Sequence, residues 1–135
     1  MDHVSIVHRC YADLIASGEK RVEARLSRVR AVPIGRVAKG DRIYFRESGG
    51  GYRALAEVTK VLCFHELNPS GIGALRRQYE PLVCAGAKFW LNHAGSRHAM
   101  FIWLGGVVEV STGPELSRKP GDRRAWFMLD RRAAA

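Results

Sequence analysis

Three consecutive glycines, residues 49–51, separate two stretches in which side chains alternate with the period of a β-strand. The first stretch covers residues 43–47 and the second covers residues 52–64. In the second, one face carries Ala54, Ala56 and Val58 and the other carries Leu55, Glu57 and Thr59. Because glycines allow two adjacent strands to fold back on each other, the pattern predicts an antiparallel hairpin.

The other apolar patterns add strands and helices around this hairpin. Further strands are expected at residues 3–8, 20–26, 98–110 and 125–129, with a bulge or bend at Gly105-Gly106. Helices are expected at residues 9–17, 68–81 and 85–93, where Gly18 ends the first, Asn68 opens the second and Pro81 closes it. The pattern therefore predicts an α+β protein, a small β-barrel of about five or six strands with two or three flanking helices.

Length and composition indicate a single domain over residues 1–135. A chain of 135 residues with 47% hydrophobic residues can bury a core without disulfides or a metal. Cys10, Cys63 and Cys84 lie far apart in the sequence and are expected to be reduced residues of the core. The histidines lack metal-site spacing, since His65-Glu66 has no second histidine after it, and neither a metal nor a cofactor is expected.

The first residues show no sign of an export signal or membrane span. They lack a basic leader and a continuous apolar run, and the longest apolar stretch, residues 99–110, is too short to cross a bilayer. A cytoplasmic chain without a membrane partner is therefore expected.

The charge balance is strongly basic. The chain has 22 basic residues, of which 17 are arginines, against 13 acidic residues, for a net charge of +9. Arginine can bind a phosphate through two hydrogen bonds and can stack on a base, so the excess favours a polyanionic partner such as RNA. A G+C-rich genome would also enrich arginine, and composition alone does not separate these explanations.

The segment from Gly18 to Leu26 concentrates charges on a predicted strand. Arg21, Glu23 and Arg25 are two residues apart and share one face, which predicts a ladder of ion pairs. Lys20 is three residues from Glu23 and points to the opposite face, unless a bulge or strong twist brings the two together. The alternative is a solvated face whose ion pairs contribute about 0–1 kcal/mol each.

This segment also resembles a known motif. Gly18-Glu19-Lys20-Arg21-Val22-Glu23-Ala24-Arg25, followed by Gly40-Asp41-Arg42-Ile43-Tyr44-Phe45 and Ala54-Leu55-Ala56-Glu57-Val58, resembles the pattern of ASCH domains in the PUA-like superfamily. The likeness covers residues 5–65 well and 89–110 loosely, so the core of the motif spans about residues 5–110, followed by a basic C-terminal extension at 111–135. It implies a PUA-like barrel with a cleft beside the lysine-bearing strand that binds RNA or modified nucleosides.

The resemblance assigns roles to individual residues. Lys20, Glu23 and Arg25 occupy the motif's lysine, acid and arginine positions. Some relatives are implied to hydrolyse an acetylated cytidine and others to be ribonucleases, but the hydrolases that act on acetylated cytidine carry threonine where this chain has Glu23. A distant acid partner for Lys20 would be Glu66 or Glu80. If buried, Lys20 could act as a base or nucleophile, and if half-exposed it would hold a phosphate or a base carbonyl.

Aromatic and basic residues outside the motif are candidates for nucleic-acid contacts. Tyr44 with Arg46, and separately Trp90, are expected to stack on bases, whereas Trp103 and Trp126 are expected in the core. The candidate phosphate contacts are Arg97, Arg118 and Lys119. The favoured hypothesis is binding of RNA or a modified nucleotide. The alternatives are a hydrolase with Lys20 and Glu23 in the catalytic site, acting as a ribonuclease or on N4-acetylcytidine, and a protein-interaction domain.

Overall fold

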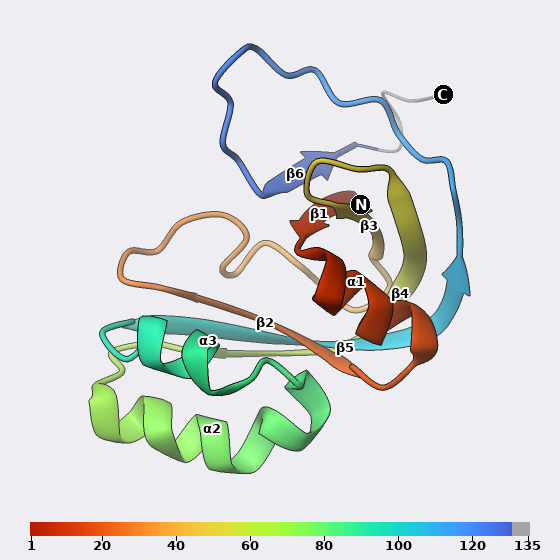
Figure 1. Cartoon of the computed structure of the whole chain (residues 1–135). Coiled ribbons are helices and arrows are strands. Elements are labelled where there is room, and N and C mark those ends of the chain that lie inside the picture. The colour runs from red at the N-terminus through yellow and green to blue at the C-terminus, as the bar shows by residue number, and fades with distance from the viewer. Residues whose placement is uncertain (131–135) are drawn as a thin grey trace.

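The computed structural model describes residues 1–130, so the last five residues of the predicted basic extension lie outside the described residues. The described part has six strands and three helices (Figure 1). The strands are β1 (Asp2–Val7), β2 (Val22–Ser27), β3 (Arg42–Glu47), β4 (Tyr52–Phe64), β5 (His98–Glu109) and β6 (Trp126–Leu129). The helices are α1 (Arg9–Ser17), α2 (Pro69–Val83) and α3 (Ala87–Asn92). The predicted α+β class is confirmed.

All six strands belong to one curled sheet that forms a half-barrel. Their order is β2-β5-β4-β3-β1-β6, so β2 and β6 are the two edge strands. The β1–β3 pair is parallel, and the other pairs are antiparallel. Helix α1 lies on one side of the sheet, whereas α2 and α3 lie on the other (Figure 1). The fold is thus a small half-barrel of six strands with three flanking helices, as the pattern predicted.

The predicted hairpin and the predicted bend are both confirmed. β3 and β4 pair antiparallel, with Phe45 opposite Ala54, and both side chains are buried. The register between β4 and β5 shifts twice, near the bend at Gly105 and Gly106. Gly106 has a φ of 56°, and a Cβ at Gly105 would lie 2.6 Å from the side chain of Thr59. The bend therefore depends on glycine at both positions.

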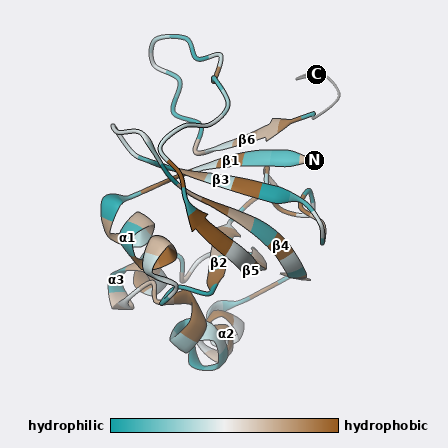
Figure 2. Ribbon diagram, turned by 90° about the vertical axis from the view of Figure 1, so that its right-hand side faces the viewer, coloured by the Kyte–Doolittle hydropathy of each residue, from teal (hydrophilic) through white to brown (hydrophobic). Residues whose placement is uncertain are grey.

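Buried residues form two clusters, one on each face of the sheet. β5 contributes to both because its side chains alternate: Met100 and Ile102 pack on the α1 side, and Ala99 and Phe101 pack on the α2 side. All four side chains are fully buried. Figure 2 accordingly shows hydrophobic residues concentrated along β5. β5 therefore contributes side chains to the buried clusters on both faces of the sheet.

The structure corrects the predicted end of the second helix. Pro81 lies inside α2, which continues to Val83 instead of ending at the proline. Proline lacks an N–H and removes one helical hydrogen bond, but Tyr79 and Val83 are buried in the core on either side of it. Cys84 closes the helix in the left-handed conformation, with its N–H bonded to the carbonyl oxygen of Glu80.

The predicted strand at residues 20–26 is shifted in the structure, where β2 runs from Val22 to Ser27. The N–H of Lys20 donates to the carbonyl of Leu14 in α1, at 3.0 Å, and that of Arg21 donates to Leu82 in α2, at 2.9 Å. Lys20 and Arg21, which the alternating pattern placed in the strand, are therefore hydrogen-bonded to two helices instead.

Two expectations about the core are also corrected. Trp126 is buried as predicted, and Trp103 packs against the core beside Tyr79 but is only half-buried, with Lys60 over its ring at 4.7 Å. All three cysteines are free, but Cys10 and Cys63 are exposed and Cys84 is half-buried, so they are not core residues. Within residues 1–130, no helix is long and apolar enough to cross a membrane, and no cluster of three metal-ligating side chains occurs.

The cap of α2 gives a testable contribution to stability. The side chain of Asn68 accepts a hydrogen bond from the Gly71 N–H at 2.8 Å. Asn68→Ala is expected to lower the free energy of unfolding by about 1 kcal/mol, because one amide at the helix start loses its acceptor. Urea denaturation measures the change. Asn68→Asp, which keeps an acceptor, is the control, and equal loss in both variants would contradict a capping role.

Candidate functional site

Lys20 and Glu23 form a buried ion pair at the start of β2. The side chain of Lys20 is 2% exposed, and its Nζ donates to the carbonyl oxygen of Val83 at 2.6 Å and lies 3.6 Å from Glu23 Oε1. The same Nζ lies 5.3 Å from the centre of the Tyr11 ring. Lys20 precedes the strand, so the alternation of side chains along β2 does not turn it away from Glu23. Because its side chain is buried, the sequence-based alternative of a half-exposed lysine is excluded.

Arg25 bridges the open side of the half-barrel. Its Nη2 donates to Ser5 Oγ of β1 at 2.5 Å, and its guanidinium lies 5.1 Å from the Trp126 ring of β6. The same Nη2 is 3.9 Å from Glu23 Oε2. Arg21, expected in the same ion ladder, lies before the strand and is exposed, and Lys20 takes its place beside Glu23.

Two polar atoms at this site are buried without a hydrogen-bond partner within the described residues. They are Glu23 Oε2, an acceptor, and Arg25 Nε, a donor. A buried polar group without a partner costs about 1–3 kcal/mol, more if it is charged. The other carboxylate oxygen of Glu23 accepts from the Ala24 N–H at 3.0 Å. A ligand that offers a donor and an acceptor would satisfy both atoms.

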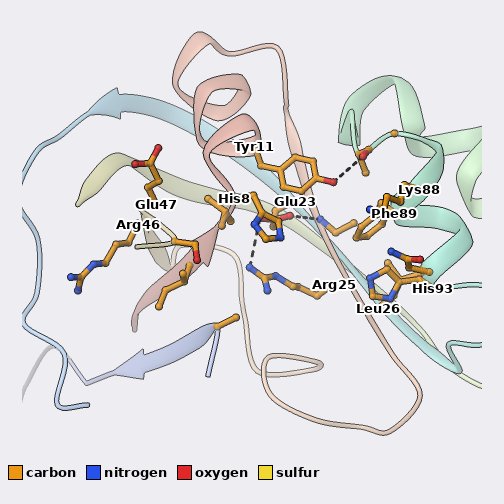
Figure 3. Close-up of a pocket in the computed structure, with 18 of the residues that line it drawn as sticks. His8, Tyr11, Glu23, Arg25, Leu26, Arg46, Glu47, Lys88, Phe89 and His93 are labelled. Atoms are coloured by element: carbon orange, nitrogen blue, oxygen red, sulfur yellow. Dashed lines mark hydrogen bonds and ion pairs between the residues drawn. The ribbon is translucent and has the colours of Figure 1, made fainter. Parts of the chain in front are cut away.

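A cavity of about 1140 Å³ opens above these residues (Figure 3). Its lining includes residues from β2, α1, α3, the β3–β4 turn and the chain between β5 and β6. Lining residues with polar, charged or aromatic side chains include Tyr11, Glu23, Arg25, Arg46, Phe89, Asn92, His93, Arg118, Arg123 and Arg124. The lining therefore combines two carboxylates, those of Glu23 and Glu47, with the aromatic rings of Tyr11 and Phe89, five arginines and Lys88.

Two rings that line the cavity, those of Tyr11 and His93, have shifted pKa values. The Tyr11 hydroxyl donates to the carbonyl oxygen of Ala85 at 2.9 Å, and burial raises its pKa, with smaller contributions from Cys10 and Glu23. Burial lowers the pKa of His93, and the positive charge of Arg25 lowers it further. His93 lies against Phe89, with ring centres 4.5 Å apart. Burial therefore favours the neutral forms of both Tyr11 and His93.

The chain between β5 and β6 carries a group of arginines, Arg118, Arg123 and Arg124, that we call the arginine arm. Hydrogen bonds from Arg124 lower the pKa of Asp122 to about 2, and Arg118 Nη2 donates to the Asp122 carbonyl at 2.8 Å. Arg118 and Arg124 also lie over the Phe127 ring. Arg123 is exposed and has no ion pair within residues 1–130. The arm thus holds two arginines in place and leaves the third free.

Several residues considered from the sequence do not take the places expected of them. Tyr44 lies outside the cavity and makes an edge contact with Tyr52, and Arg46, which lines the cavity, lies over Tyr52 rather than beside Tyr44. Trp90 is 3% exposed and its indole N–H donates to Glu80, so its burial corrects the expectation that it stacks on a base. Two of the candidate phosphate contacts, Arg97 and Lys119, are exposed beyond the cavity lining.

Neither distant acid pairs with Lys20 among the described residues. Glu66 is exposed. The Glu80 carboxylate accepts from the N–H groups of Ala85 and Gly86 as well as from the Trp90 indole, which secures the connection between α2 and α3. The ion pair of Lys20 is with Glu23 instead.

Sequence reasoning missed most of the cavity wall. Phe89, Asn92 and His93 are spaced i, i+3 and i+4 and share one face around α3, a periodicity that could have identified them together. Tyr11 carries no comparable signal, because its position depends on contacts between α1 and the distant Ala85.

Comparison with solved structures identifies proteins of similar fold at low sequence identity. No family model matches the chain, and no curated protein matches it. The structure of a mutant ASCH protein from Zymomonas mobilis shares 16% identity, with a TM-score of 0.73, over 98% of this chain and 93% of that one. Another ASCH structure from Zymomonas mobilis shares 18% identity, with a TM-score of 0.64, over 80% and 69% of the two chains.

An ASCH domain from Lactobacillus crispatus is similar at a TM-score of 0.53, with 15% identity over 79% of this chain and 80% of that one. Identities this low establish a common architecture and do not transfer an activity. This chain therefore has the ASCH-domain fold.

Proposed function

We propose that the cavity binds a nucleoside unit. The unit is either one nucleotide of an RNA strand or a free or modified nucleoside. The observation that carries the proposal is the pair of buried atoms without partners within the described residues, Glu23 Oε2 and Arg25 Nε, on two residues that line the cavity. Every nucleobase offers donors and acceptors on its edges, so a base can satisfy a carboxylate and a guanidinium together.

The arginines around the cavity support an anionic ligand. Arg46 lies on one side, and the arginine arm contributes three more guanidinium groups. Guanidinium groups bind phosphate in a bidentate manner, and the net charge of +9 would speed the approach of a polyanion. Phosphate contacts would position the ligand, and the cavity would bind its base.

Lys20 would act indirectly in this proposal. It is buried and lies outside the cavity lining, whereas Glu23 belongs to that lining. Its contacts with Val83 and Glu23 hold the carboxylate in one direction. Lys20 is thus a positioning residue for Glu23.

The response to salt tests the proposal. The affinity of single-stranded RNA, measured by filter binding, is expected to fall steeply as salt rises, because phosphate contacts release counterions. Arg123→Gln should weaken binding about 3- to 10-fold and reduce the log–log salt slope by about 1. Arg77→Gln, an exposed arginine outside the cavity, is the control. An RNA affinity that is independent of salt would contradict a phosphate-driven mode, and absence of RNA binding would favour a protein partner.

Hydrolysis in the same cavity is a second candidate, favoured by the placement of Tyr11 and Lys20 around Glu23. Incubation with RNA and with N4-acetylcytidine, followed by chromatography, would reveal a ribonuclease or an amide hydrolase. Product that still forms with a folded Lys20→Ala variant would remove Lys20 from the mechanism. Product that depends on Glu23 but not on the arginine arm would favour a nucleoside substrate over RNA.

A further inference from the structure

The cavity follows the outer edge of β2. Four successive residues of this strand line it: Glu23, Ala24, Arg25 and Leu26. Successive side chains of a strand point to opposite faces, so a cavity over one face would meet only alternate residues. Contact with all four places the cavity beside the strand, along its free edge. β2 is an edge strand with β5 on its other side.

The register identifies which main-chain groups face the cavity. Glu23 and Arg25 pair with Ile102 and Met100 of β5, and the Arg21 carbonyl accepts from the Leu104 N–H at 2.9 Å in the same series. In an antiparallel ladder, alternate residues exchange hydrogen bonds with the neighbour and those between them turn their N–H and C=O groups away. The groups of Ala24 and Leu26 therefore face the free edge.

One of these edge groups is already occupied. The Ala24 N–H donates to Glu23 Oε1 at 3.0 Å. The register implies that three main-chain groups remain available to a ligand: the Ala24 carbonyl, the Leu26 N–H and the Leu26 carbonyl. These groups span two residues, or about 7 Å of strand. That length fits one heterocyclic base, whereas strands that pair with a sheet are usually about five or six residues long.

We propose that the main-chain edge of β2 at Ala24 and Leu26 hydrogen-bonds to the Watson–Crick edge of one unpaired nucleobase, which stacks on Phe89 or His93. The inference rests on the proposed function and specifies its ligand as a single-stranded nucleotide. The rings of Phe89 and His93, whose centres are 4.5 Å apart, also line the cavity and lie near Arg25 and Leu26 in Figure 3. A base in a duplex cannot bind in this way, because its Watson–Crick edge is already paired.

Nuclear magnetic resonance of the ¹⁵N-labelled chain tests the contact directly. The four ribonucleoside 5′-monophosphates are titrated, and the tightest is expected to shift the Leu26 amide and to slow its hydrogen exchange at least tenfold. The Ile102 amide, which lies in the β2–β5 ladder and outside the cavity lining, is the internal reference. Binding that leaves the Leu26 amide unchanged would overturn the inference but not the proposed function. Failure of every nucleotide and of single-stranded RNA to bind at low salt would overturn both.

Blocked bases provide a test that needs no change to the protein. The same nucleotide methylated at N1 of a purine or N3 of a pyrimidine is expected to bind at least tenfold more weakly, because its Watson–Crick edge is obstructed. An RNA duplex should likewise bind more weakly than either single strand. Equal affinities for methylated and unmethylated nucleotides would overturn the inference. So would an extended peptide that slows Leu26 exchange where nucleotides do not, since that would assign the edge to strand addition.

The stacking contact has a matched pair of variants on α3. Phe89→Ala is expected to weaken nucleotide binding about tenfold or more, in line with the effect of removing one stacked aromatic ring. Leu91→Ala is the control, since Leu91 is on the same helix, 71% exposed and outside the cavity. Circular dichroism verifies that both variants fold. Equal affinities in the two folded variants would contradict stacking on Phe89.

Discussion

Replacement of Lys20 by methionine is expected to lower the free energy of unfolding by about 3–5 kcal/mol, the range for breaking a buried ion pair on one side. Methionine approximates the shape of the lysine stem but loses the hydrogen bond to Val83 and the partner 3.6 Å from Glu23. The Glu23 carboxylate would then remain buried with Arg25 as its only other charged neighbour within the described residues. Urea denaturation gives the change in free energy.

Two further variants make this result specific to the pair. Lys39→Met removes a lysine from an exposed turn and should change the free energy of unfolding by less than about 0.5 kcal/mol. Lys20→Met combined with Glu23→Gln removes both charges and should be less damaging than the sum of the single changes. A Lys20→Met protein as stable as the Lys39→Met protein would show that the buried pair contributes nothing to the fold.

The features of the fold that were predicted correctly depend on local sequence. The hairpin around the three glycines and the bend at Gly105-Gly106 require backbone conformations that few other residues adopt easily. The errors arise where distant contacts override local preference. Pro81 is a strong signal for a helix end, yet the burial of Val83 carries α2 past it. β2 begins two residues late because α1 and α2 bind the main chain of Lys20 and Arg21.

The site was predicted only as far as a motif can define it. Lys20, Glu23 and Arg25 could be identified from their order, but the partner of Lys20 is the carbonyl of Val83, which is 63 residues away. The choice between Phe89 and Trp90 shows the same limit. Adjacent positions on a helix point about 100° apart, so the packing of α3 decides which ring faces the cavity. Trp90 is buried against Glu80, and Phe89 lines the wall.

Arg25 both contacts other strands of the barrel and lines the cavity. It links β2 to Ser5 of β1 and Trp126 of β6, yet its Nε has no partner within the described residues. This atom adds no stabilising contact to the barrel and carries the cost of an unpaired buried group, but it is oriented by the atoms that do make contacts. The guanidinium is therefore fixed by the fold while one donor stays free for a ligand, which separates its structural role from its binding role.

Arg25→Lys is expected to weaken nucleotide binding about 100-fold, equivalent to about 2.7 kcal/mol, while the protein remains folded. Lysine keeps the positive charge and can still reach Ser5 or Glu23, but it has no Nε donor and no planar fork. Removal of a donor from a buried charged contact costs about 2–5 kcal/mol in binding, since the partner's acceptor is left without a replacement. Isothermal titration calorimetry measures the affinity, and urea denaturation measures the stability of the same sample.

The comparison with Arg77→Lys, at an exposed position on α2 outside the cavity, separates charge from geometry, because both changes conserve charge. If the Nε of Arg25 contacts the ligand, only Arg25→Lys should lose affinity, and its salt slope should stay close to that of the unaltered chain. A parallel loss of stability and affinity would indicate that Arg25 acts only by holding the strands together. Unchanged affinity would show that the free donor faces no ligand, because a lysine cannot reproduce a hydrogen bond made by Nε.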